Sequence, residues 1–372
     1  MNIKGCLLQS AAAAVFLFGV GAARADSEGA AYTMTNAPDE NQIVVFSRDA
    51  HGLLTKTGMV DTGGKGSGGG VDALGSQGSL MLASDGDDRR GGVDHDGEWL
   101  LAVNAGSNDV SVFRVMADGI ALQDRIGSGG TFPVSATIAE DRVYVLNEGA
   151  PANITGFKLS RHGHLSPLSN STRLLGDGAF GQVAFDSKGK NLVVTDKAAG
   201  RILVYRVNDN DLPAMTPVVS PSSGSVPFGV AFDKKGHLLA VEAGSNAVSS
   251  YDILHDGGLQ TITESAANGQ LATCWIVANS RGDVITANPG THSLSAFHVD
   301  TGTGQVSLLN GAAGVGDAPL DIDVSENGRF VYAVDPAAGG VDMFRIEHDG
   351  SLTGMGSVDA GLALFAQGMA VR

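Results

Sequence analysis

Three places in this sequence could carry proton-transfer chemistry. Glu242 ends the apolar run LLAVE, and PLDIDVS places Asp321 and Asp323 on one face of a strand. Neighbouring carboxyls raise the pKa of one member and can create a general base. The same pair could instead bind a cation or accept hydrogen bonds from buried backbone. His292, in NPGTHS, is the candidate imidazole, although a solvated loop histidine fits that pattern too.

A repeated element must position these residues. LLAVNAGSNDVSVF (100–113) and LLAVEAGSNAVSSY (238–251) are near copies, and similar segments recur along the chain. In each, an apolar strand leads to an acid or amide, a Gly/Ala/Pro turn and a strand that ends in an aromatic residue. The aromatics are separated by 67, 44, 48, 46, 46 and 47 residues, and they are Phe46, Phe113, Phe157, Tyr205, Tyr251, Phe297 and Phe344.

A period near 46 residues with four short strands per unit is typical of propeller blades. Residues 226–262 show the unit clearly, with VPFGVAF, LLAVE, VSSYDI and LQTIT as its four strands. The sequence therefore predicts an all-β fold, a seven-bladed propeller of four-stranded antiparallel blades. The first unit lacks its first strand, and AQGMAVR (366–372) is a lone first strand. We expect the two to pair and close the ring.

Two rings of side chains are expected at one mouth of the central channel, where first strands begin and second strands end. The side chains at the second-strand ends would either cap the following turns or offer oxygen acceptors to a polar ligand. They are Asn36, Asn104, Asn147, Asp196, Glu242, Asn288 and Asp335. The first-strand starts differ between units, and they are Ser79, Ser135, Gln182, Gly229, Trp275, Asp321 and Gly368. Gln182 and Trp275 are the best candidates to contact a sugar-like or planar ligand, although Trp275 could also pack between blades.

The long first interval contains a Gly-rich stretch and an acidic insertion, together residues 61–97, which we interpret as surface loops. The insertion could bind Ca²⁺, but its acids miss the spacing of a known calcium loop, so no metal is predicted. The sequence also lacks a Gly-rich phosphate loop, an H-x-x-x-H pair and a G-x-S-x-G elbow, so no cofactor is expected.

The first 25 residues have the pattern of a cleavable signal peptide, with Lys4, an apolar stretch and Ala23-Arg24-Ala25. This predicts a secreted or periplasmic protein in which residues 26–372 form one domain. The formal net charge of −16 disfavours nucleic acid as a partner. No later apolar run is long enough to span a membrane. A closed ring needs no partner, so a monomer is the default expectation.

The phrases VYVLNEG, FVYAVDPA and PFGVAFDKKGHLLAVE resemble the YVTN-type repeats of the seven-bladed lactonase family. That family includes 6-phosphogluconolactonase and carboxymuconate-lactonising enzymes, and the resemblance spans nearly the whole chain after residue 25. It implies a His and then an Arg just after Pro at the starts of consecutive first strands, with a Glu at a nearby second-strand end. Those places read Phe180-Gly181-Gln182 and Pro227-Phe228-Gly229 here, and Glu242 matches the glutamate.

Two functions follow from these observations. The first is a non-catalytic propeller that binds a small polar or ring-containing ligand at the channel mouth, because the His and Arg are not matched. The alternative is an active lactonase or a lactone-forming cyclase or isomerase. In that case Glu242 or Asp321 would act as base, and Gln182 with His292 would polarise the carbonyl.

Overall fold

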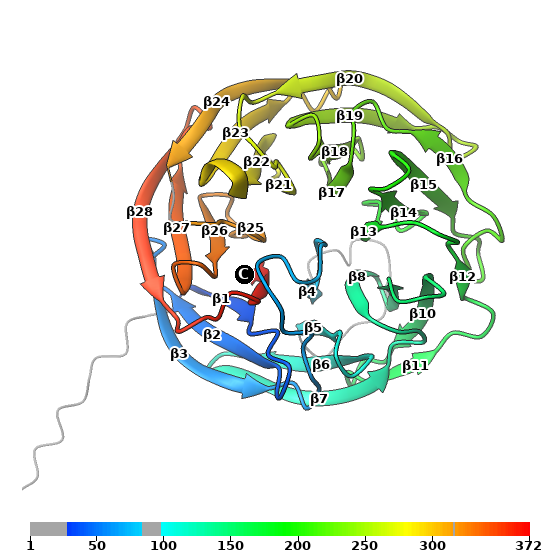
Figure 1. Ribbon diagram of the computed structural model, residues 1–372, viewed down its shortest axis with the longest axis horizontal. Coiled ribbons are helices and arrows are strands. Elements are labelled where there is room, and N and C mark those ends of the chain that lie inside the picture. Colours follow the sequence, from blue (N-terminus) through cyan, green and yellow to red (C-terminus); the bar gives the residue numbers. More distant parts are fainter. Residues whose placement is uncertain (1–27, 84–97, 315–316) are drawn as a thin grey trace, which may run out of the picture.

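Seven β-sheets stand around a central axis in the computed structural model, which describes residues 28–83, 98–314 and 317–372 (Figure 1). Each sheet is a blade whose strands run outward in order from the channel to the rim. In blade 3 two short strands share the outermost position. This confirms the predicted seven-bladed all-β propeller.

The strands follow the blades in chain order. Blade 1 contains β29 (Gln367–Val371), β1 (Gly29–Met34), β2 (Gln42–Arg48) and β3 (Leu54–Asp61). Blade 2 contains β4 (Leu80–Ala83), β5 (Trp99–Asn104), β6 (Asp109–Met116) and β7 (Gly119–Gly127). Blade 3 contains β8 (Pro133–Ala139), β9 (Arg142–Asn147), β10 (Asn153–Leu159), β11 (Leu165–Pro167) and β12 (Arg173–Leu174). Blade 4 contains β13 (Phe180–Phe185), β14 (Asn191–Asp196), β15 (Arg201–Arg206) and β16 (Val218–Pro221).

The remaining blades repeat this plan. Blade 5 contains β17 (Pro227–Phe232), β18 (Leu238–Glu242), β19 (Ala247–Ile253) and β20 (Leu259–Ala267). Blade 6 contains β21 (Trp275–Ala278), β22 (Asp283–Asn288), β23 (Ser293–Val299) and β24 (Val306–Gly314), with a 3₁₀ turn η2 (Pro289–Thr291) between β22 and β23. Blade 7 contains β25 (Ile322–Val324), β26 (Phe330–Asp335), β27 (Gly340–Ile346) and β28 (Leu352–Asp359).

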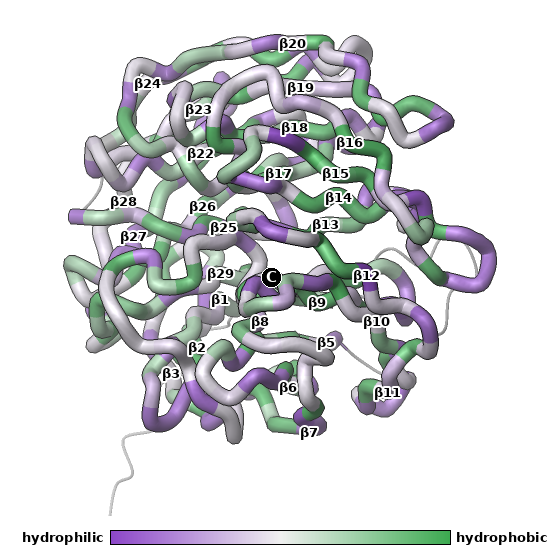
Figure 2. Tube along the Cα trace, turned by 45° about the vertical axis from the view of Figure 1, so that its right-hand side comes forward, coloured by the Kyte–Doolittle hydropathy of each residue, from purple (hydrophilic) through white to green (hydrophobic). Residues whose placement is uncertain are grey.

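The core lies between the blades, on the second and third strands. Strands such as β5, β22 and β26 are buried along their whole length, whereas the outermost strands alternate with solvent-exposed residues. The seven repeat aromatics are each at most 2% exposed, so they are the anchors that fix the spacing of the blades. Figure 2 shows hydrophilic residues concentrated in the connecting loops and hydrophobic ones along the strands.

The predicted closure of the ring is confirmed. β29 pairs antiparallel with β1, with Ala31 opposite Val371 and Thr33 opposite Met369. The hydroxyl of Thr33 also donates to the carbonyl of Gly368 at 2.7 Å. Figure 1 shows β29 beside β1 at the hub, so the beginning and end of the described chain complete one blade.

The predicted signal peptide (1–25) lies outside the described residues, as does the acidic insertion from residue 84 to residue 97. Within the described part of the chain, no helix is long and apolar enough to cross a membrane.

Candidate functional site

The central channel contains a cavity of about 290 Å³. The innermost strands line it, and Gln182, Asp321, Asp323, Glu98 and Arg372 supply most of its polar side chains. Exposure increases along these strands: the first residues of β4, β21 and β25 are buried and the last ones are partly exposed. Within the described residues, the cavity therefore opens where the innermost strands end, on the face opposite the predicted mouth.

The predicted mouth is closed by residues 72–77, which we call the plug. The hydroxyl of Ser76 donates to the Val134 carbonyl at 2.7 Å, and the carbonyl of Ser76 accepts from the indole of Trp275 at 3.0 Å. Gln367 donates to the same carbonyl at 2.9 Å and accepts from the Leu74 amide at 3.2 Å. These contacts tie the plug to blades 1, 3 and 6. The expectation of a surface loop is wrong here, because Leu74 and Ser76 are at most 1% exposed.

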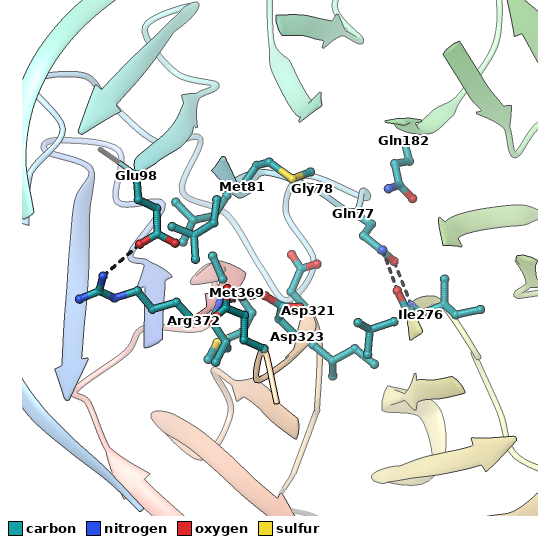
Figure 3. A pocket seen from close by; sticks show the side chains of 17 residues that line it. Gln77, Gly78, Met81, Glu98, Gln182, Ile276, Asp321, Asp323, Met369 and Arg372 are labelled. Carbon is teal, nitrogen blue, oxygen red and sulfur yellow. Dashed lines mark hydrogen bonds and ion pairs between the residues drawn. The ribbon is translucent and has the colours of Figure 1, made fainter. Parts of the chain in front are cut away.

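Gln77, the last residue of the plug, supplies a side chain that blade 5 lacks. Its amide nitrogen donates to the Ile276 carbonyl at 2.8 Å, and its amide oxygen accepts from the Ile276 amide at 2.9 Å (Figure 3). A Cβ on Gly229 would lie 2.2 Å from that oxygen. Glycine at position 229 thus leaves the space that the Gln77 amide occupies.

The other inward-facing polar residues join neighbouring blades in the same way. Gln182 accepts from the Val230 amide at 2.6 Å, and Asp321 accepts from the Gly368 amide at 2.9 Å. Asp323 accepts from the Val371 amide at 2.8 Å. In each case a side chain of one innermost strand bonds the backbone of the next blade, 47 or 48 residues later. We call these contacts inter-blade clips.

The carboxyls near the axis are held toward their neutral forms. Burial raises the pKa of Asp321 well above its usual value, and the charges of Asp72 and Asp323 act in the same direction. Burial also raises the pKa of Asp323 to about 7, although two backbone amides stabilise its ionised form. The pKa of Asp72, in the plug, rises to about 7 because burial outweighs the nearby charge of Lys197. Burial therefore favours the neutral forms of the carboxyls that line the cavity, compared with carboxyls in water.

The three predicted catalytic residues are not brought together. Asp321 lines the cavity, but Glu242 and His292 do not. Glu242 is buried beside the loop before blade 5, where it accepts hydrogen bonds from Ser222 at 2.6 Å and Tyr251 at 3.2 Å. Burial raises the pKa of Glu242 above its ordinary value. His292 is exposed at the end of η2, and its Nδ1 contacts the carbonyl of Asp317.

The predicted ring at the second-strand ends lies inside the turns. Asn104 bonds Asn41, in the turn between β1 and β2, and Thr62, directly after β3, both within 2.9 Å. Four further members of the ring are fully buried and likewise bond residues close by in the sequence or in the adjoining loops. They are Asn147, Asp196, Asn288 and Asp335. None of the five lines the channel cavity. In blade 1 the pairing of Ala31 with Phe46 places Thr35 at the equivalent position, one residue before the expected Asn36.

Trp275 stands at the start of β21, as predicted, but it is covered by the plug. It is 1% exposed and packs edge-on against Phe228, with ring centroids 5.2 Å apart. Its indole nitrogen already has a partner in Ser76. Its place in the structure is between the plug and blade 5, whereas Gln182 reaches the cavity itself.

Sequence reasoning missed Gln77 and the ion pair at the open end of the cavity. There Arg372 and Glu98 form an ion pair at 3.0 Å, which Figure 3 marks with a dashed line. A signal for the plug did exist, because Leu74 is a large apolar residue in a Gly-rich stretch and Gln77 stands three residues before an innermost strand. Among the described residues, no group of three His, Cys, Asp or Glu side chains is arranged to hold a metal ion.

Comparison with known proteins supports the fold. The family model described as lactonase, 7-bladed beta-propeller, matches residues 243–361, which cover parts of blades 5 to 7. A candidate 6-phosphogluconolactonase from Bacteroides fragilis has a TM-score of 0.72 at 17% identity, covering 94% of this chain and 99% of that one. The periplasmic gluconolactonase of Pseudomonas aeruginosa has a TM-score of 0.68 at 15% identity, covering 92% and 99%. No curated protein matches the sequence.

Proposed function

We propose that this protein is an exported binding propeller that takes a neutral, sugar-like ring in its channel cavity and does not turn lactones over. The observation that carries this proposal is the plug. It covers the mouth where lactonase-like catalysis would be expected, and Gln77 occupies the space over Gly229, in the segment where the resemblance implies an arginine. Neither Glu242 nor His292 lines the cavity.

Two polar atoms that the inter-blade clips do not use favour a hydroxyl-rich ligand in the cavity. Among the described residues, the Gln182 amide nitrogen and the second carboxyl oxygen of Asp321 have no hydrogen-bond partner in the protein. An amide donor and a protonated carboxyl can bind a ring hydroxyl or a carbonyl oxygen. A cavity of about 290 Å³ is at the small end of ligand sites.

The lining of the cavity disfavours a phosphorylated ligand. Besides the buried Asp321 and Asp323 it contains Glu98 and Glu326, and its arginine, Arg372, is paired with Glu98. A phosphate would need a convergent cationic clamp. The sugar-lactone specificity in the names of two structural neighbours therefore suggests the unphosphorylated ring as the first ligand to test.

Calorimetric titration of the purified protein with glucono-1,5-lactone, glucose and 6-phosphogluconate tests the binding. We expect saturable binding of a neutral ring and none of the phosphorylated acid. D321A removes both the donor and the acceptor of this carboxyl and should weaken binding about tenfold, the effect of one lost hydrogen bond. E242Q changes a buried carboxyl outside the cavity and should bind as the parent does. The proposal fails if no neutral ring binds, or if D321A and E242Q behave alike.

The alternative, an active lactonase or lactone-forming cyclase, is favoured by the family match over residues 243–361. A hydrolysis assay with sugar, acyl and muconate lactones separates the two. Turnover that disappears in E242Q establishes the enzyme, whereas turnover at background in both proteins supports the binding function. Export is tested by locating the protein in cell fractions and sequencing the mature N-terminus, which we expect at Asp26.

A further inference from the structure

A second cavity, of about 530 Å³, lies on the outer part of the ring between blades 2 and 3. We call it the rim pocket. Strands β5, β6 and β7 and the turn after β10 surround it, and its lining residues are Trp99, Arg114, Gln123, Arg161 and His162. None of these described lining residues is acidic, although acids outnumber Lys and Arg by 40 to 24 in the whole chain. The described lining of the rim pocket thus contains two arginines and no acidic residue.

The close packing of blade 3 on Trp99 forms the base of this pocket. A Cβ on Gly163, whose φ is +78°, would lie 2.3 Å from the Trp99 ring, so the turn can approach this closely only with glycine there. Trp99 is 2% exposed, and its indole nitrogen has no hydrogen-bond partner among the described residues. The tryptophan is therefore held rigidly beside the basic residues.

The terminal N–H groups of Arg161 are available to bind a ligand. Its Nε donates to Nε2 of His162 at 3.2 Å, and among the described residues it forms no ion pair with a carboxylate. Other exposed arginines do form such pairs, for example Arg345 with Glu347 at 2.6 Å. The terminal nitrogens of the Arg161 guanidinium therefore remain to bind an acceptor from solution. The charge of Arg114 and the amide of Gln123 complete the lining.

We propose that the rim pocket binds the phosphate group of a small organic phosphate monoester. A guanidinium presents parallel N–H donors that match two oxygens of a phosphate, and such charge-assisted bonds are the strong class of hydrogen bond. The second guanidinium adds charge, and Gln123 adds a donor. This site is separate from the channel cavity and does not depend on the function proposed for it.

Calorimetric titration of the intact protein with glycerol 3-phosphate at low salt tests the proposal, with glycerol as the uncharged control. We expect saturable binding of the phosphate ester, with affinity lowered at least tenfold in R161A and further in R114A/R161A. R345A makes the same charge change on an exposed arginine of blade 7 and should leave affinity unchanged. Because Arg161 is exposed, R161A should keep the parent circular dichroism spectrum and melting temperature.

Three results would overturn this assignment. The first is no saturable binding of glycerol 3-phosphate, and the second is an equal loss of affinity in R161A and R345A, which would indicate only long-range charge effects. The third is binding to phosphatidylglycerol vesicles without binding of glycerol 3-phosphate, which would assign the surface to a lipid headgroup. A failure here leaves the channel experiment unaffected, because none of these variants lines the channel cavity.

Discussion

The pairing of Gln77 with Gly229 can be tested by a double-mutant cycle. Q77A leaves the backbone N–H and C=O of Ile276 without their partners, and Ile276 is 1% exposed. An unsatisfied buried group costs about 1–3 kcal/mol, and water from the adjoining cavity can replace part of each bond. We therefore expect Q77A to lower the free energy of unfolding by about 2 kcal/mol.

G229A acts on the same space from the other side. Its Cβ would lie 2.2 Å from the Gln77 amide oxygen and 2.8 Å from the Cys274 carbonyl, so either the amide moves or the strands separate. Overpacking of this kind costs about 1–3 kcal/mol. In the Q77A background the contact with the amide is gone and the one with Cys274 remains. The double variant should therefore be more stable than the sum of the two losses predicts, by about 1 kcal/mol or more.

Urea-induced unfolding followed by tryptophan fluorescence measures these free energies, and Trp275 lies against the plug as a local reporter. Q260A, an exposed glutamine-to-alanine change on β20, is the matched control and should change stability by less than about 0.5 kcal/mol. If the losses from Q77A and G229A add to within about 0.5 kcal/mol, the two positions do not share one space and the assignment of the plug is wrong.

Three further predictions follow from the closure, the buried carboxyls and the plug. Deleting Gly368–Arg372 should lower the melting temperature by roughly 5–10 °C, because β1 loses its partner strand; calorimetry that finds an unchanged transition would contradict the closure. Burial raises the folded-state pKa of Asp321, so its neutral form stabilises the fold fully below the unfolded pKa of about 4, and this stabilisation is lost as the pH rises toward the folded pKa. D321N cannot ionise, so its stability relative to the parent should rise between pH 4 and pH 8 in urea titrations, and a constant difference would refute the assignment. W275F should cost about 1 kcal/mol, because the Ser76 carbonyl loses the indole donor but keeps Gln367; no change in the urea midpoint would show that the indole bond contributes nothing.

The fold was predictable because its evidence is repeated. Each blade carries the same aromatic anchor and the same turn, so errors at one unit are corrected by the others, and the ends of the series reveal the closing strand at Gly368–Arg372. The register was also recoverable: Gln182 and Asp321 were placed as equivalent residues, and both bond the next innermost strand. One slip occurred in blade 1, where a longer turn shifts the equivalent position from Asn36 to Thr35.

The site was less predictable because the plug is not part of the repeat. Its sequence is rich in glycine, which indicates a loop but not where the loop lies, and its partners are distant in sequence: Gln77 bonds a residue 199 positions away. Leu74 was the available hint. Without the plug, Trp275 looks like a ligand-facing aromatic and the wrong end of the channel looks open. Glu242 and His292 were chosen for their chemistry, and tertiary packing separates both from the channel cavity.

The inter-blade clips also restrict which catalytic side chains could be introduced at the innermost strands of this fold. Placing a histidine at position 182 and an arginine just after Pro227, at position 228, would recreate the pattern of the resembling enzymes. The first change would remove the acceptor for Val230, and the second would replace Phe228, whose ring packs edge-on against Trp275. Introducing that pattern would therefore need further mutations that restore the lost contacts and displace the plug. A side chain that holds two blades together cannot easily take part in catalysis as well. Gln182 and Gln77 already hold neighbouring elements together in this molecule.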